Sequence, residues 1–192
     1  MNDENLAQFI ERGASKYWGK YRGFVKDRDD KDKLGRLKVT VPSVLGDAVT
    51  GWAWPALPYA GHNLGFFFLP QVGDLVWIEF IEGDLEHPLW SGGGWGKPGD
   101  ATEIPEEAKA NYPDTQVICT KAHHVIILDD KAGAEQIVIR DKAGSTITLN
   151  QDGTVSITTK KNIELIANDG NGDISIKANK VTVTVADSMD VK

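Results

Sequence analysis

The stretch that decides the fold runs from Gln136 to Lys192 and reads QIVIRDKAGSTITLNQDGTVSITTKKNIELIANDGNGDISIKANKVTVTVADSMDVK. Apolar and polar residues alternate in it almost without interruption, which is the period of a half-buried β-strand. Clusters of turn formers, such as Lys142-Ala143-Gly144 and Gln151-Asp152-Gly153, separate the alternating runs. The sequence therefore predicts one short strand and one turn, repeated roughly every eight to eleven residues.

One copy of this repeat cannot build a core, because each strand carries a single narrow apolar stripe opposite a polar face. A single-chain solenoid usually needs coils of about twenty residues. The shorter spacing favours several chains that pool their stripes around one axis, and an antiparallel sandwich is the alternative. We predict a trimer in which Val155, Ile157, Ile163, Leu165, Ile174, Ile176, Val181, Val183 and Val185 fill the shared axis.

Composition narrows the class of protein. The 192 residues, 41% of them apolar, suffice for one large or two small folded domains. No run approaches the length of a membrane span, and the acidic amino terminus predicts no secretory signal. A lone cysteine, Cys119, excludes a disulfide framework and fits assembly in a reducing cytoplasm. The net charge of -7 argues against nucleic acid as a partner.

Residues 20–96 have the pattern of short strands and turns that is typical of a small closed β-barrel. Gly and Pro punctuate the short strands, and Val76, Ile78 and Phe80 are predicted to share one face. Five tryptophans are expected in the barrel core and at subunit contacts. The expected strands are Tyr21 to Lys26, Leu34 to Val41, Gly51 to Trp54, Gly65 to Leu69, Asp74 to Ile81 and His87 to Ser91.

Two short motifs fail on inspection. The tract from Asp27 to Lys33 resembles a calcium loop in composition, but Lys31 or Leu34 falls where a ligand is required, so we expect a solvated hairpin turn. The tract Gly92 to Lys97 resembles a phosphate loop, but Ser91 replaces its first Gly and Pro98 its hydroxyl residue.

No catalytic, cofactor-binding or metal-binding site is predicted. The carboxylate pairs Asp129 with Asp130 and Glu82 with Asp84 fall at strand ends and tight turns rather than across a cleft. Cys119 and Ser91 have histidines nearby in sequence, but no third residue that would orient them. His123 and His124 are a lone pair without the spacing of a metal site.

The flanking segments also carry predictions. Residues 1–19 are predicted to form a short helix in which Leu6, Phe9 and Ile10 share one face, either contacting a hub or neighbouring subunit or packing on their own domain. Residues 97–115 contain three prolines and are expected to form a semi-rigid linker.

Several blocks of sequence resemble one known family in their order and spacing. That family comprises the central spikes of contractile machines: baseplate assembly protein V of phage tails, the VgrG spikes of type VI secretion, and the spikes of extracellular injection systems. The resemblance covers roughly residue 21 to the carboxyl terminus, with His123 in place of the usual Gly. The blocks are GRLKVTVP (Gly35–Pro42), PQVGDLVWIEF (Pro70–Phe80), EGD (Glu82–Asp84), HPLWSG (His87–Gly92), PEEA (Pro105–Ala108), Tyr112-Pro113 and HVIILDD (His124–Asp130).

The resemblance implies an all-β architecture. An OB-fold barrel at residues 20–96 would follow the helical segment 1–19, and the linker 97–115 would lead to a triple-stranded β-helix at 116–192. It implies a homotrimer that is assembled in the cytoplasm on a baseplate hub and pierces the target cell envelope. Some members of the family carry a lytic domain between barrel and β-helix, but the linker 97–115 is too short to hold one, so neither enzymatic activity nor a cofactor is predicted. A PAAR-like tip protein would bind at Met189 and Val191.

Two alternatives from other classes remain at this point. One is an OB-fold protein that binds nucleic acid, and the other is a trimeric tail fiber that binds or cleaves polysaccharide.

Overall fold

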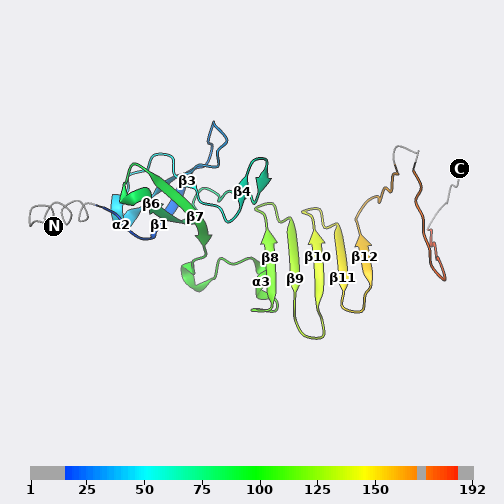
Figure 1. Cartoon of the computed structure of the whole chain (residues 1–192). Coiled ribbons are helices and arrows are strands. Elements are labelled where there is room, and N and C mark those ends of the chain that lie inside the picture. The colour runs from blue at the N-terminus through cyan, green and yellow to red at the C-terminus, as the bar shows by residue number, and fades with distance from the viewer. Residues whose placement is uncertain (1–15, 168–171, 186–192) are drawn as a thin grey trace, which may run out of the picture. The chain divides into compact units, whose positions relative to one another are not determined.

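The computed structural model describes residues 16–167 and 172–185. They belong to two compact units that divide between Ile104 and Pro105 (Figure 1). No helix in this part of the chain is long and apolar enough to cross a membrane. Residues 1–15, with Leu6, Phe9 and Ile10, lie outside the described part, as do Met189 and Val191.

The first unit is built on a five-stranded sheet with the strand order β2-β1-β6-β7-β3. Only the β3–β7 pair is parallel. A separate two-stranded ladder joins β4 to β5. The elements are β1 (Tyr21–Asp27), β2 (Lys38–Thr40), α2 (Pro42–Leu45), β3 (Trp54–Pro55), β4 (Ala60–Gly61), β5 (Leu64–Gly65), β6 (Leu75–Phe80), the 3-10 turn η1 (Ile81–Gly83), β7 (Pro88–Gly94) and the 3-10 turn η2 (Pro98–Asp100).

The core of the first unit lies against the apolar face of β6. Val76, Ile78 and Phe80 are buried in strict alternation along that strand, as predicted. Trp90 is 2% exposed, and its indole N–H donates to the carbonyl oxygen of Gly35 at 3.0 Å. Gly23 lets β1 approach β6, because a Cβ there would lie 2.6 Å from Cγ1 of Ile78. The remaining buried apolar residues are Val25, Leu37, Val39, Val41 and Ala53.

One expectation for this unit is wrong, and a second holds only in part. The strand expected from Gly65 to Leu69 ends at Gly65, because the ladder of β4 and β5 is only two residue pairs long. Phe66, Phe67 and Phe68 follow it without strand partners and are exposed. The tract from Asp27 to Lys33 is not simply solvated, because Asp30 is buried. Of the tryptophans expected in the core or at subunit contacts, Trp90 is buried in the core, and Trp54 and Trp95 are exposed.

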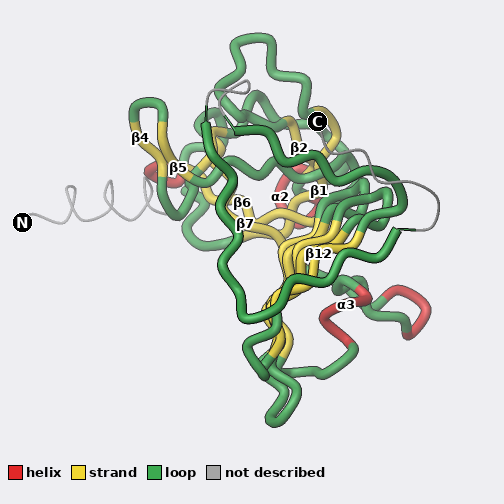
Figure 2. Tube along the Cα trace, turned by 90° about the vertical axis from the view of Figure 1, so that its right-hand side faces the viewer, coloured by secondary structure: helices red, strands yellow, loops and turns green. Residues whose placement is uncertain are grey.

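The second unit is a single antiparallel sheet in which each strand pairs with its neighbours in sequence. The strand order is β12-β11-β10-β9-β8. Figure 2 looks along this stack, so that the strands lie behind one another. All ladders of the described sheet form within one chain, so no second chain is needed to pair these strands. The elements are α3 (Glu106–Lys109), β8 (Thr115–Cys119), β9 (Val125–Asp129), β10 (Gln136–Arg140), β11 (Thr146–Asn150) and β12 (Val155–Thr158).

The segment around α3 covers one face of this sheet at its β8 end. Glu107 forms an ion pair with Arg140, and the amide of Asn111 donates to Oδ2 of Asp129 at 2.7 Å. Val125 and Asp129 are buried in this region. The opposite face of the sheet has no such cover from the described residues, and its side chains are exposed.

Beyond β12 the structure assigns no strand within residues 159–167 and 172–185. The apolar residues of the repeat in this part are all exposed: Ile163, Leu165, Ile174, Ile176, Val181, Val183 and Val185. A strand on the edge of a one-layer sheet gains hydrogen bonds from one neighbour and little burial, so propensity alone does not extend the ladder. Their place in a trimer core stays a prediction.

Replacement of Trp90 tests the core of the first unit. Trp90→Ala should lower the free energy of unfolding by about 3–5 kcal/mol, because it removes a buried indole and leaves a cavity. Trp95→Ala is the matched control, since Trp95 is 69% exposed, and it should stay within about 0.5 kcal/mol. Urea unfolding followed by tryptophan fluorescence measures both. Equal losses in the two variants would contradict the placement of the core.

Candidate functional surface

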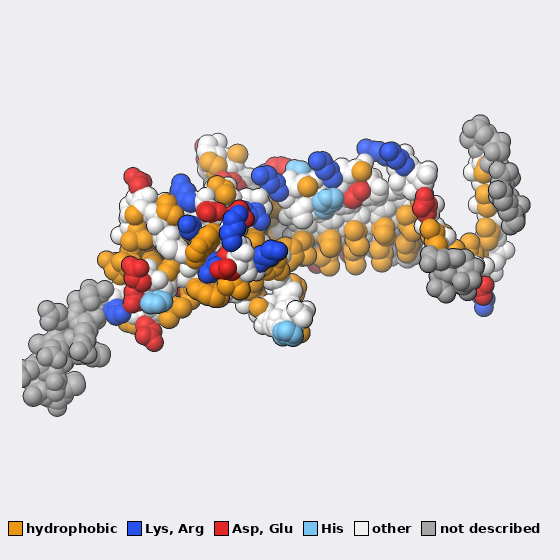
Figure 3. Space-filling model, turned by 90° about the horizontal axis from the view of Figure 1, so that it is seen from above, with side chains coloured by type: hydrophobic (Ala, Val, Ile, Leu, Met, Phe, Trp, Pro, Cys, Tyr) orange, Lys and Arg blue, Asp and Glu red, His pale blue; other side chains and the backbone are white. Residues whose placement is uncertain are grey.

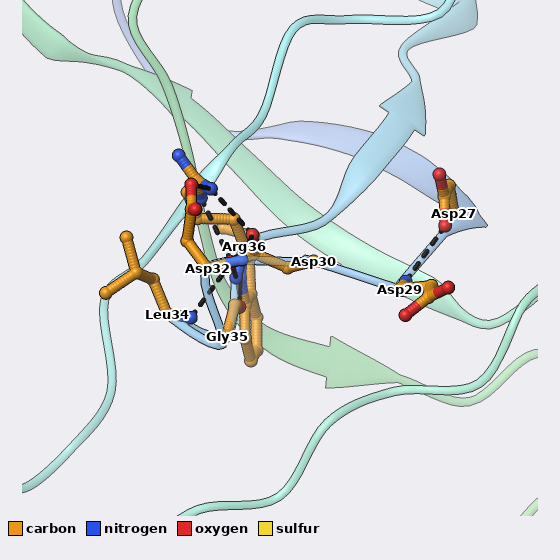
Figure 4. Close-up of polar contacts among 8 residues, drawn as sticks. Asp27, Asp29, Asp30, Asp32, Leu34, Gly35 and Arg36 are labelled. Carbon is orange, nitrogen blue, oxygen red and sulfur yellow. Dashed lines mark hydrogen bonds and ion pairs between the residues drawn. The ribbon is translucent and has the colours of Figure 1, made fainter.

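A buried carboxylate holds the loop between β1 and β2. The Asp30 side chain is 3% exposed and that of Arg36 is 15% exposed. Nε of Arg36 donates to Oδ2 of Asp30 at 3.0 Å, and a terminal nitrogen of Arg36 donates to Oδ1 at 2.6 Å (Figure 4). The backbone N–H groups of Asp32 and Leu34 also donate to this carboxylate, at 3.1 and 3.0 Å. Both oxygens of Asp30 are therefore fully used in fixing the loop.

The same loop is tied to the core and to the surface tryptophans. The guanidinium of Arg36 lies 5.6 Å from the ring centre of Trp52 and 5.5 Å from that of Trp54. The next residue toward the amino terminus, Gly35, accepts the hydrogen bond from the buried Trp90. The cluster thus stabilises the fold, because its charges are paired and stacked rather than directed at an open cleft.

The electrostatics follow from this geometry. The hydrogen bonds from Arg36 hold the pKa of Asp30 well below its ordinary value, and Asp30 raises the pKa of Arg36. Both groups therefore stay charged at neutral pH, as a structural ion pair requires.

The largest exposed apolar feature of the described second unit is one face of the β8–β12 sheet. Cross-strand pairing aligns its side chains in two columns, and Figure 3 shows the resulting row of hydrophobic side chains. Between 37% (Ile126) and 60% (Val155) of each side chain is exposed. One column contains Ile118, Ile126, Ile139, Ile147 and Ile157, and the other Leu128, Ile137, Leu149 and Val155, with Gln116 at its start.

This face matches the alternation read from the sequence. Val155 and Ile157 lie on it opposite Leu149 and Ile147, whereas Ser156 points to the other side of the sheet with Thr148. A contiguous apolar face of this kind marks an interaction surface, because isolated soluble domains seldom expose one. The columns extend from β8 to β12, so the surface also includes Ile118, Ile126 and Leu128, which the sequence analysis had not assigned to the core of the trimer.

The residues weighed for catalysis lie apart from any shared cleft. Asp129 is buried and hydrogen-bonded to Asn111, whereas its neighbour Asp130 is exposed in a turn. Directly after η1, Oδ2 of Asp84 lies 3.6 Å from Nδ1 of His87, and both side chains are exposed to solvent. Burial raises the pKa of the Cys119 thiol above its ordinary value, which disfavours the nucleophilic thiolate.

Metal ligands do not gather in the part of the chain that the structure describes. No group of three or more His, Cys, Asp or Glu side chains there has the geometry to hold an ion. Nδ1 of His124 instead accepts a hydrogen bond from the backbone N–H of Lys142 at 3.3 Å.

Comparison with known proteins agrees with this architecture. Residues 21–95 match the family described as "Type VI secretion system/phage-baseplate injector OB domain". An OB-type domain is therefore present, as the sequence analysis predicted. The chain is mostly β with few helices.

Three relatives illustrate the similarity. The chain is 26% identical to the "Type VI secretion system spike protein VgrG3" of Vibrio cholerae over 64% of its own length and 13% of that protein. It is 27% identical to the "Actin cross-linking toxin VgrG1" of Vibrio cholerae, over 56% of the chain and 10% of that protein. It is 26% identical to the "Type VI secretion system spike protein VgrG1b" of Pseudomonas aeruginosa, over 64% of the chain and 18% of that protein. The chain thus spans less than a fifth of these relatives.

The Asp30 ion pair gives a pH-dependent prediction. Because the pKa of Asp30 is lower in the folded than in the unfolded protein, its stabilising contribution is complete above about pH 4 and is lost as the pH falls further. Asp30→Asn should therefore be less stable than the parent at pH 7 and lose less on acidification from about pH 5 to pH 3.

Thermal unfolding followed by tryptophan fluorescence checks this, since all six tryptophans precede residue 105. Asp29→Asn is the matched control, because the Asp29 side chain is 77% exposed and pairs only with Lys31 at the surface. Parallel pH profiles for the parent and Asp30→Asn would contradict a structural role for the pair.

Proposed function

The chain belongs to the VgrG-like family of baseplate and spike proteins, and on that premise we propose that it is the structural central spike of a contractile tail or injection system. In this proposal it is a homotrimer without enzymatic activity. The OB domain sits on the baseplate hub, and the β-sheet unit forms the shaft that pierces the target cell envelope. The protein is assembled in the cytoplasm and ends as part of a virion tail baseplate or an extracellular injection particle.

The observation that carries this proposal is the exposed two-column apolar face of the β8–β12 sheet. Leaving the face in water is unfavourable by about 25 cal/mol for each Å² of apolar surface. Within the described residues nothing in the same chain covers it, so the cover is expected from identical chains.

Three copies suit the dimensions of the face. Two columns on alternate residues stand roughly 7 Å apart, so three sheets turned inward would meet around one axis and fill it with six side chains a layer. In this arrangement each copy supplies one side of a prism and keeps its hydrogen-bond ladders to itself. The shaft is then held together by its apolar axis rather than by strands exchanged between chains.

Such a shaft has the mechanical properties that piercing requires. Its strands lie across the long axis, and consecutive strands are linked by hydrogen bonds about every 4.7 Å along it. Separation of the chains would expose the whole axis at once, so we expect unfolding to be slow.

A pair of neighbouring substitutions in β12 tests the trimer. Ile157→Asp would bring three carboxylates together on a dry axis, where each unpaired charge costs several kcal/mol, so assembly should fail. Ser156→Asp, on the opposite face, should change the stability of the trimer by no more than about 0.5 kcal/mol. Light scattering coupled to size-exclusion chromatography gives the mass of each assembly.

Two results would count against the proposal. A parent protein that is monomeric at micromolar concentration would exclude the homotrimer. Trimeric parent protein with indistinguishable masses for Ile157→Asp and Ser156→Asp would instead show that a different face forms the core.

The carboxyl terminus is proposed as the seat of a separate, PAAR-like tip protein. The alternation continues to Met189 and Val191, and burial of such apolar side chains against a partner is favourable. Deletion of residues 188–192 should leave the trimer intact and abolish retention of the tip in a pull-down with the neighbouring tip gene product. Equal retention by full-length and truncated trimers would place the seat elsewhere.

A further inference from the structure

The turns of the second unit gather on two opposite edges of its sheet. Consecutive strands from β8 to β12 are antiparallel, so alternate connections lie on the same side. The turns 120–124 and 141–145 share one edge with residues 159–161, which follow β12. Residue 114, before β8, shares the other edge with turns 130–135 and 151–154.

The first edge is basic. Its turns contain four lysines against one aspartate, Asp141, together with two histidines. Contacts join these turns into one strip: the backbone N–H of Lys142 donates to His124, and Nζ of Lys160 lies 3.2 Å from the position that a Cβ on Gly144 would take. Figure 3 looks onto this edge, where Lys and His side chains stand beside the hydrophobic row. The four lysines are Lys121, Lys142, Lys160 and Lys161.

The second edge is acidic. It carries four carboxylates against one lysine, Lys131. A shallow groove runs along it, where Asp130 and Glu135 lie beside the apolar Leu128 and Ile137. The backbone N–H of Asp130 donates to the carbonyl oxygen of Asp114 at 2.9 Å, so this edge is also continuous. The four carboxylates are Asp114, Asp130, Glu135 and Asp152.

Neither set of charges is neutralised by the part of the chain that the structure describes. Among the described residues, no ion pair involves any of these four lysines or four carboxylates. All eight residues are exposed. Each edge therefore presents a strip of unpaired charge directly beside the apolar face.

We propose that, in the homotrimer proposed above, the basic edge of each copy lies against the acidic edge of the next, with lysine side chains of one copy in the acidic groove of its neighbour. The copies are then related by rotation about an axis parallel to the stacking direction of the strands, and all point the same way. Turning one copy end over end would exchange its edges and bring like charges together at both of its seams. The charges thus select the parallel arrangement.

The expected effect is on orientation and rate of association more than on final stability. Exposed ion pairs each contribute little to stability, whereas complementary charged surfaces steer association and repel wrong pairings. Burial of the apolar face drives assembly whether the copies are parallel or one is turned end over end. The charged edges therefore distinguish the parallel arrangement from the other.

Charge reversal on one edge at a time tests this. Lys142→Glu with Lys160→Glu makes both edges acidic, and Asp130→Lys with Glu135→Lys makes both basic. Each double variant should form trimers at least about ten-fold more slowly than the parent at low salt after dilution from denaturant, measured by light scattering. High salt should remove most of the difference, because it screens exposed charges.

The fourfold variant with both edges reversed is the decisive arm, because it restores complementarity with opposite polarity. It should associate faster than either double variant, which a merely misfolded sheet would not do, although more slowly than the parent, because two lysines and two carboxylates keep their original sign on each edge. Lys26→Glu with Lys97→Glu is the control for net charge, since both lysines are exposed in the first unit, and it should leave the rate unchanged.

The outcomes separate the two proposals. Trimeric parent protein whose single-edge variants associate at the parental rate, or whose fourfold variant is no faster than either double variant, would overturn the edge pairing and leave the trimer standing. A monomeric parent protein would overturn the trimer itself and the edge pairing with it.

Discussion

An apolar face that the described residues of the chain leave uncovered is the constraint on which this structure depends. Each strand of the β8–β12 sheet pairs with its neighbours in the same chain, yet the sheet leaves two columns of Ile, Leu and Val side chains in water. The opposite face receives some cover from the segment around α3, where Arg140 pairs with Glu107. A contiguous apolar face left exposed in this way is typical of an interaction surface.

The first unit, in contrast, buries its apolar core within a single chain. Its core closes around Val76, Ile78 and Trp90 in a single chain, and the long β1–β2 loop is fixed by the carboxylate of Asp30. Its buried residues all come from the same chain, so this core needs no partner to close. The division between Ile104 and Pro105 separates a self-sufficient platform from a unit whose stability is proposed to come from assembly.

The sequence predicted the features that repeat and missed those that do not. Alternation placed Val76 and Ile78 in the core and put Ile157 and Ser156 on opposite faces, because a period of two is visible without the fold. The Asp30–Arg36 pair escaped notice, since a bond across a loop leaves no periodic signal and an acidic tract looks solvated. The helix α3 has only four residues, which is about one turn and too short for a helical period. Phe66, Phe67 and Phe68 resembled a strand by composition. The ladder between β4 and β5 ends at Gly65, however, so these three residues lie outside it.

The strictly sequential pairing of β8 to β12 has a consequence for how shafts of different length can arise. Insertion or loss of a whole hairpin changes the length by two strands, about 9–10 Å, and returns every later turn to its original edge. Insertion of a single strand would reverse the direction of all later strands and move their turns to the opposite side. Length should therefore vary in even steps, with the hairpin rather than the strand as the unit of change.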